Sequence, residues 1–197
     1  MIARWDLRVA AALSALTLAV GPVRAQSGTP PEPIDLIATL NAVCTASQGD
    51  RAKAAALATE AGFSPVPASM LPRMRNSSET TGFMKSSATD VAFVMTGKIT
   101  RTIGRKTVVI EFCGVSARPT DHRALERRLR DLMNFPPVRG GGFEAYAWLQ
   151  TPEGRAPARD LGDAQFVAMA ETGQMRMLGI DRSSPGSTLI YFLPRLD

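Results

Sequence analysis

Two adjacent runs of β-branched and aromatic residues in the middle of the chain constrain the fold most. The runs Val91–Thr100 and Lys106–Cys113 are separated by a short polar connector that contains Gly104. Two such runs around a short glycine-containing loop predict a β-hairpin. The second run ends on Cys113, one of two cysteines in the chain. We therefore expect the hairpin to anchor the segments that precede it, and none of its residues forms a catalytic motif.

The N-terminus has the pattern of a secretory signal peptide. Arg4 and Arg8 precede an apolar run of 12 residues at 9–20, and the Val-Arg-Ala sequence at 23–25 fits a cleavage site. The apolar run is shorter than the ~20 residues that a spanning helix needs, so a membrane anchor is the less favoured alternative. We predict that residues 1–25 are removed. The chain is then periplasmic or secreted, with no membrane span after removal of the signal.

The rest of the chain has the length of one domain. We predict a disordered, proline-rich lead-in at 26–32, followed by a single domain over 33–197. The charge is uneven, because residues 91–142 carry ten basic and four acidic side chains. This excess is too sparse for the dense lysine and arginine stripe of a nucleic-acid-binding protein, so no nucleic-acid partner is predicted.

The two cysteines are predicted to form a disulfide, Cys44–Cys113, because paired cysteines are the usual state in exported chains. Cys44 falls on the apolar stripe of a predicted helix, together with Leu36 and Leu40. A reduced buried pair and a redox or metal site are the alternatives. The chain has no C-x-x-C spacing that favours the latter, so we predict no metal ion and no cofactor.

Helical and strand patterns flank the hairpin. Two N-terminal helices are predicted, one that opens at Pro33 and one over 51–61, and a central helix is predicted from Pro119 to about Asn134. Turn residues separate further strands, predicted at 143–150, 165–171, 175–181 and 188–193. This order predicts an α+β domain: a mainly antiparallel sheet of five to six strands, with the two N-terminal helices and the central helix packed on it.

A long loop is predicted at 64–89. It holds three prolines and a cluster of serines and threonines, and it shows no sustained period. Loops of this length inside a domain are uncommon, and they are often functional or disordered. Three interpretations are open: a crossover packed on the domain, a lid over a ligand, or disorder.

Two groups of side chains are candidate binding residues. The central helix carries four arginines that form a possible anion-binding group: Arg123, Arg127, Arg128 and Arg130. Tyr146 and Trp148 alternate on a predicted strand, so they share one face and form a possible ligand-stacking pair. The alternatives are a solvated helix face for the arginines and a place in the core for the aromatic pair.

His122 is the single histidine of the chain, and Asp121 precedes it. A serine, histidine and aspartate constellation is conceivable, but adjacent helical residues do not face each other, so a solvated histidine is favoured and no catalytic residue is assigned. The leading hypothesis is an exported, non-enzymatic accessory protein that binds an unidentified ligand or partner, either a protein or an envelope component. The alternatives are a small periplasmic hydrolase with its site around His122 and a structural, envelope-associated protein.

Overall fold

The computed structural model describes residues 34–71, 77–140, 143–158, 162–181 and 186–197. The predicted signal peptide and the predicted lead-in lie outside these residues. Within the described ranges, no helix is both long enough and apolar enough to cross a membrane.

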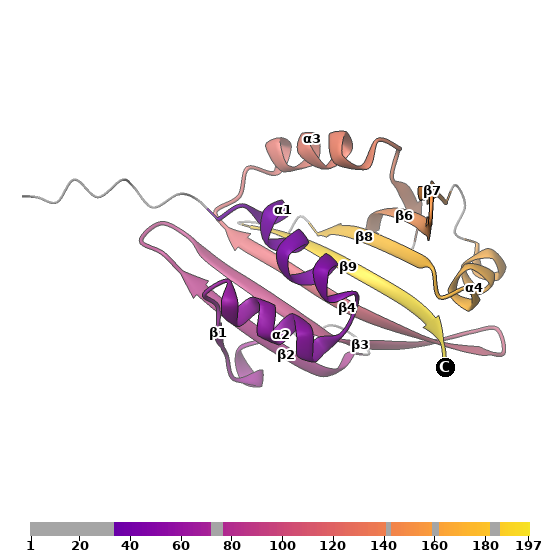
Figure 1. Ribbon diagram of the computed structural model, residues 1–197, viewed down its shortest axis with the longest axis horizontal. Helices are drawn as coiled ribbons and strands as arrows, with labels where there is room; N and C mark the ends of the chain where they lie inside the picture. The colour runs from indigo at the N-terminus through magenta and orange to yellow at the C-terminus, as the bar shows by residue number, and fades with distance from the viewer. Residues whose placement is uncertain (1–33, 72–76, 141–142, 159–161, 182–185) are drawn as a thin grey trace, which may run out of the picture. The chain divides into compact units, whose positions relative to one another are not determined.

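A long antiparallel hairpin lies at the centre of the sheet (Figure 1). Its strands, β3 (Val91–Ile103) and β4 (Lys106–Arg118), pair along their whole length, and the predicted hairpin is confirmed. Gly97 of β3 faces Phe112 of β4, and a Cβ atom at Gly97 would lie 2.7 Å from the Phe112 ring. Glycine is therefore needed here, because the aromatic ring covers its backbone.

Seven further strands extend the hairpin on both sides, and all pairs are antiparallel. The order across the sheet is β1-β2-β3-β4-β9-β8-β6-β5, and β7 also pairs with β6. The C-terminal strand β9 therefore lies between β4 and β8, near the middle of the sheet. The bounds of these strands are β1 Ser64–Pro65, β2 Ser77–Ser86, β5 Val138–Gly140, β6 Phe143–Thr151, β7 Gly154–Pro157, β8 Met175–Asp181 and β9 Ser187–Leu196.

Helices cover both faces of this sheet. One face carries α1 (Leu36–Thr39), its continuation as the π-helix η1 (Leu40–Thr45), α2 (Arg51–Glu60) and α3 (His122–Met133), which share one apolar core with Cys113 and Val115 of β4. The helix α4 (Asp163–Glu171) packs instead on Val108 and Ile110. Because side chains alternate along a strand, these two pairs of β4 residues point to opposite faces. A short 3₁₀ turn, η2, spans Ala68–Met70.

The disulfide joins the helical layer to the centre of the sheet. Cys44 of η1 and Cys113 of β4 are bonded, with their Cα atoms 5.3 Å apart and 69 residues between them in sequence. Both cysteines are buried, and the described residues contain no free cysteine. The predicted pairing is confirmed.

The predicted strand count is wrong, because the described residues form a sheet of nine strands rather than five to six. Part of the difference lies in the segment predicted as a long loop, which contains β1, η2 and β2. β2 buries only Gly82 and Phe83 and leaves polar side chains exposed, so it lacks the apolar alternation that marks most strands. Residues 72–76 of that segment lie outside the described residues.

A second correction concerns residues 165–171, which were predicted as a strand and form most of α4. Phe166, Met169 and Ala170 recur with helical spacing and pack on the sheet, and Asp163 lies in the first turn, where an acidic side chain favours a helix start. The structure thus has a fourth helix where the prediction had three.

Candidate functional site

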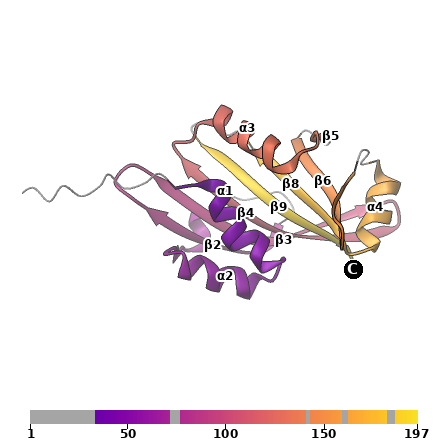
Figure 2. The same ribbon diagram turned by 45° about the horizontal axis from the view of Figure 1, so that its top comes forward.

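A cavity of about 340 Å³ lies between α3 and the strands β6 and β8, and we call it the α3 cavity. In Figures 1 and 2, α3 lies over this part of the sheet. Ligand pockets commonly measure ~300–1,000 Å³, so this volume suits a small ligand or a single side chain of a partner. The cavity is lined by Glu126, Arg130, Pro136, Pro137, Glu144, Tyr146 and Ile180.

The sequence of α3 positions two of these side chains. Asp121 caps the helix start, since its carboxylate accepts a hydrogen bond of 3.0 Å from the backbone N–H of Ala124. An apolar stripe with helical spacing is buried against the sheet: Leu125, Leu129 and Met133. Glu126 and Arg130 each follow a residue of this stripe, so both lie along its flank, one helical turn apart.

The sheet and one connection supply the other lining residues. Glu144 and Tyr146 alternate on β6 and therefore share a face, and Glu144 pairs with Ile180 of β8. The helix α3 ends at Met133, and its C-cap residue, Asn134, adopts a left-handed backbone conformation with φ 57°. Pro136 and Pro137 then lead the chain from α3 to β5, and their rings form one wall of the cavity.

The lining combines charged and apolar groups. Two carboxylates and one guanidinium give the lining a formal charge of −1. Ionised carboxylates only accept hydrogen bonds, so they select ligand groups that donate, and an amino group adds favourable charge. The proline rings and Ile180 offer apolar surface for the stem that carries such a group.

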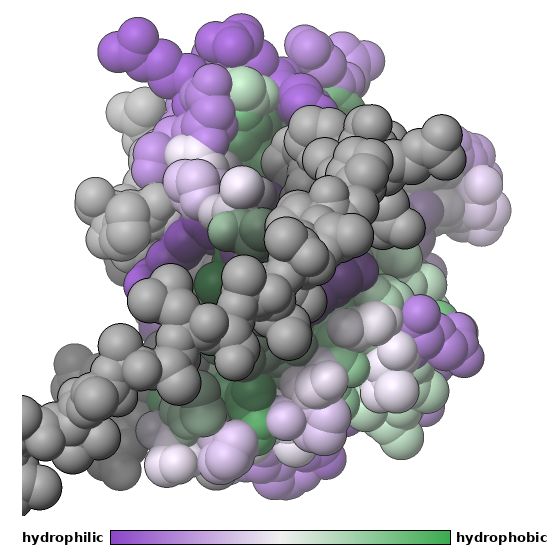
Figure 3. Space-filling view, turned by 90° about the vertical axis from the view of Figure 1, so that its left-hand side faces the viewer, coloured by the Kyte–Doolittle hydropathy of each residue, from purple (hydrophilic) through white to green (hydrophobic). Residues whose placement is uncertain are grey.

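The four predicted anion-binding arginines are all exposed on α3. Figure 3 shows hydrophilic residues gathered at the top of the view, where α3 lies. Arg128 donates a hydrogen bond of 2.6 Å to the carboxylate of Asp35 at the start of α1. Arg130 contributes to the α3 cavity, whereas Arg123 and Arg127 do not line it. The four side chains therefore share no single site, and anion binding by them stays a prediction.

The predicted stacking pair is buried under α3 and the segment after it. Tyr146 is 2% exposed and Trp148 is 4% exposed. The ring of Phe135 packs edge-on against both, with centroid distances of 5.9 Å to Tyr146 and 6.5 Å to Trp148. This is the arrangement expected of core residues. A ligand entering the α3 cavity meets Tyr146, but the two rings present no open stacking surface.

His122 forms one long-range contact. Its Nδ1 atom lies 2.5 Å from the Oγ atom of Ser187, the first residue of β9. The carboxylate of Asp121 is engaged in the helix cap rather than in this pair. Ser187 is buried, so its hydroxyl is withdrawn from solvent. The contact joins the start of α3 to the centre of the sheet.

Sequence reasoning missed most of the cavity residues: Glu126, Pro136, Pro137, Glu144 and Ile180. One usable signal was the alternation of Glu144 with Tyr146, which puts a carboxylate on the same strand face as a candidate ligand residue. Within the described ranges, no group of three or more histidine, cysteine, aspartate or glutamate side chains is placed to hold a metal ion.

Comparison of the chain with models of protein families, with curated proteins and with solved structures finds no match. Function is therefore argued from the geometry and chemistry of the site.

Proposed function

We propose that the chain is a non-enzymatic binding protein of the periplasm or the extracellular space, and that the α3 cavity is its ligand site. The cavity and its charged lining are the observation that carries the proposal. The compartment is supported by the Cys44–Cys113 disulfide, because such bonds persist in oxidising environments. The signal-like N-terminal sequence supports the same compartment.

The lining favours a compact ligand with an amino group on a short apolar or polyol stem. Glu126 and Glu144 place carboxylates on opposite walls, one from the helix and one from the sheet, and each carboxylate can accept more hydrogen bonds than the contact it already makes. An ammonium group has three donors and no acceptor, which complements carboxylates. Arg130 at the same cavity would accommodate a ligand acceptor such as a hydroxyl or carbonyl oxygen.

Thermal unfolding tests this proposal with ethanolamine, glucosamine and spermidine as probes, each at constant ionic strength. At a probe concentration of about 100 times Kd, binding stabilises the fold by ~2.7 kcal/mol, and Tm rises by roughly 5–10 °C for a domain of this size. We expect at least one amine to give this saturable rise. Ethylene glycol and glucose, which lack the amino group, should give a smaller one.

Two substitutions and a matched control locate the binding. Glu126→Gln and Glu144→Gln keep the shape of the side chains and remove the charges, so each should abolish most of the rise in Tm. Glu153→Gln removes an exposed carboxylate in the turn between β6 and β7 and should leave the rise intact. The proposal fails if no amine stabilises the wild-type chain, or if the rise survives in both cavity variants.

A second candidate function, a small hydrolase, is favoured by the hydrogen bond between Ser187 and His122. A histidine base beside a serine hydroxyl is the core of a nucleophilic dyad. The burial of Ser187 weighs against it, because a substrate carbonyl has to reach the hydroxyl. Hydrolysis of p-nitrophenyl acetate separates the two functions: a hydrolase loses turnover in Ser187→Ala, whereas a binding protein shows the same background rate in wild type and variant.

A further inference from the structure

A partly buried arginine on β8, Arg176, has no anionic partner among the described residues. Arg176 donates two hydrogen bonds of 2.9 Å from Nη1, to the backbone carbonyls of Gly173 and Met175. Its Nε atom is buried and has no hydrogen-bond partner in the described part of the chain. Arg176 forms no ion pair with a carboxylate among the described residues. A buried charge with an unpaired donor is costly unless an anion or a polar group satisfies it.

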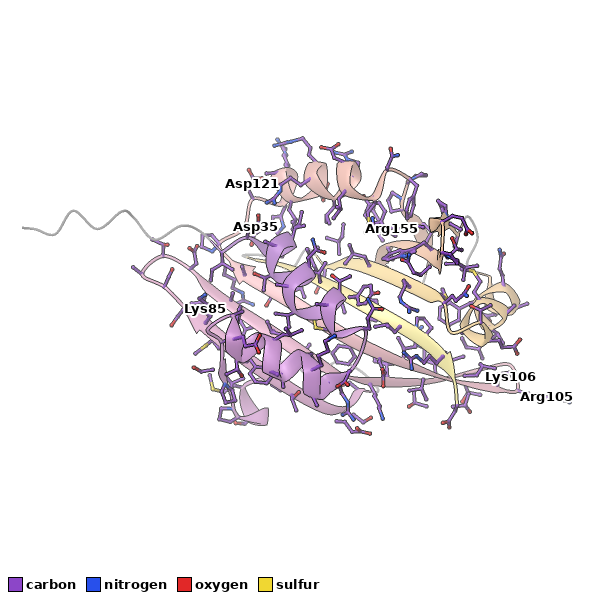
Figure 4. All side chains as sticks on the ribbon, in the orientation of Figure 1. Asp35, Lys85, Arg105, Lys106, Asp121 and Arg155 are labelled. Atoms are coloured by element: carbon purple, nitrogen blue, oxygen red, sulfur yellow. A yellow bond between two sulfur atoms is a disulfide. The ribbon has the colours of Figure 1, made fainter. Side chains whose placement is uncertain are left out.

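A second guanidinium lies beside the same strand pair. Arg155 of β7 extends over the ring of Trp148, with its Cζ atom 5.4 Å from the ring centroid. Its Nη1 atom donates a hydrogen bond of 3.2 Å to the carbonyl of Leu132 at the end of α3. Figure 4 shows Arg155 at this end of α3. Trp148 is also the cross-strand partner of Arg176 on β8, so both arginines flank one ring.

Both arginines act on one hydroxyl group. Tyr191 of β9 lies beside Trp148, with ring centroids 6.2 Å apart, and Arg176 lies close enough to influence the pKa of its hydroxyl. Burial raises the pKa of Tyr191, and the positive charges of Arg176 and Arg155 oppose that rise. Two positive charges thus act on one tyrosine hydroxyl, and neither arginine is ion-paired within the described part of the chain.

We propose that Arg155, Arg176 and Tyr191 form a binding site for a small oxyanion, a carboxylate or a phosphate group. The unpartnered Nε donor of Arg176 supplies one hydrogen bond to the ligand, and the exposed guanidinium of Arg155 supplies a second. The apolar ring of Trp148 lowers the local dielectric and strengthens these contacts. This site is separate from the α3 cavity and does not rest on the proposed function.

The fluorescence emission of Trp148 reports on ligand binding at this site. Of the two tryptophans of the chain, Trp5 lies in the predicted signal peptide, so Trp148 is the only tryptophan of the processed chain. Titration with sodium phosphate and with sodium acetate, each against sodium chloride at matched ionic strength, distinguishes a phosphate from a carboxylate ligand. We expect a saturable change in emission with at least one of the two oxyanions and none with chloride.

Arginine substitutions test the assignment. Arg155→Gln and Arg176→Gln should each weaken the apparent affinity at least about tenfold, because each removes a charge-assisted hydrogen bond. Arg105→Gln, in the distant hairpin turn, should leave the titration unchanged. If Arg176→Gln does not fold, Arg155→Gln alone tests the assignment, because Arg155 is exposed.

The proposal is overturned if neither oxyanion changes the emission, or if Arg155→Gln binds as tightly as wild type. Glu126→Gln and Glu144→Gln should not affect this titration, so the two binding proposals fail independently.

Discussion

At the scale of single residues, Asp35 joins the first helix to α3. One carboxylate oxygen accepts hydrogen bonds from the backbone N–H groups of Ile37 and Ala38, which caps α1. The other accepts the hydrogen bond of 2.6 Å from Arg128. The Arg128 hydrogen bond is the main cause that holds the pKa of Asp35 below its usual value of 3.8, and partial burial opposes it.

We predict that the contribution of Asp35 to stability is lost in acid. Because the pKa is lower in the folded state, the ionised carboxylate stabilises the fold at neutral pH, and this stabilisation disappears as the pH falls through the folded-state pKa. Asp35→Ala should cost about 1 kcal/mol at pH 7, mostly from the lost helix cap. Arg128→Ala should cost less, ~0.2–1 kcal/mol, since the pair is largely exposed.

Urea unfolding at pH 7 measures the costs of the two substitutions, and a second measurement at pH 2.5 tests the loss of the Asp35 contribution in acid. The difference in unfolding free energy between wild type and Asp35→Asn should narrow as the pH falls, because protonation removes the charge that distinguishes the two side chains. Asp131→Asn, on the exposed side of α3, is the control, and its free energy of unfolding should differ little from that of wild type. A difference for Asp35→Asn that is as large at pH 2.5 as at pH 7 would show that charge is not the cause.

At the scale of elements, the sequence predicted those parts whose pattern is local and strongly apolar. The hairpin of β3 and β4 and the helix α3 have continuous apolar periodicity, and both were predicted near their observed bounds. β2 was missed because it lies near the edge of the sheet and is mostly polar on its solvent side. α4 was misread because its run of apolar residues is short, and helix and strand periods are hard to separate over so few residues.

The candidate site was less predictable than the fold elements. The α3 cavity depends on β6 pairing with β8 and on α3 crossing above them, and both are long-range arrangements. The same holds for Arg155 and Arg176, which come together only because β7 folds back on β6. The pattern of alternation showed that Tyr146 and Trp148 share a face, but it did not show that Phe135 covers them.

At the scale of the whole molecule, the disulfide holds the N-terminal helices on the sheet. It closes a loop that contains α2, β1, β2 and β3, and it attaches to β4, which lies near the centre of the strand order. The helices α1 and η1 have few residues of their own, so they depend on tertiary contacts for stability.

We predict that Cys113→Ser lowers Tm by roughly 10 °C. A bridge that closes a loop of this length stabilises the fold by about 4 kcal/mol on the chain-entropy model, and each kcal/mol shifts Tm by ~2–4 °C in a domain of this size. The double variant Cys44→Ser, Cys113→Ser should be no less stable than the single one, because the bond is already lost. Thermal unfolding by circular dichroism measures both. Unchanged Tm in both variants would show that packing alone holds the two layers together.

Chemical-shift mapping tests directly whether the α3 cavity binds a compact amine. Uniformly ¹⁵N-labelled chain is titrated with whichever of ethanolamine, glucosamine and spermidine stabilises it most, and the amide signals are followed in ¹H–¹⁵N correlation spectra. We expect saturable shifts concentrated at Glu126, Arg130, Glu144 and Ile180, and we expect Glu144→Gln to abolish them. Shifts that are absent, or that are spread over exposed acidic residues such as Glu60 and Glu153, would contradict this expectation.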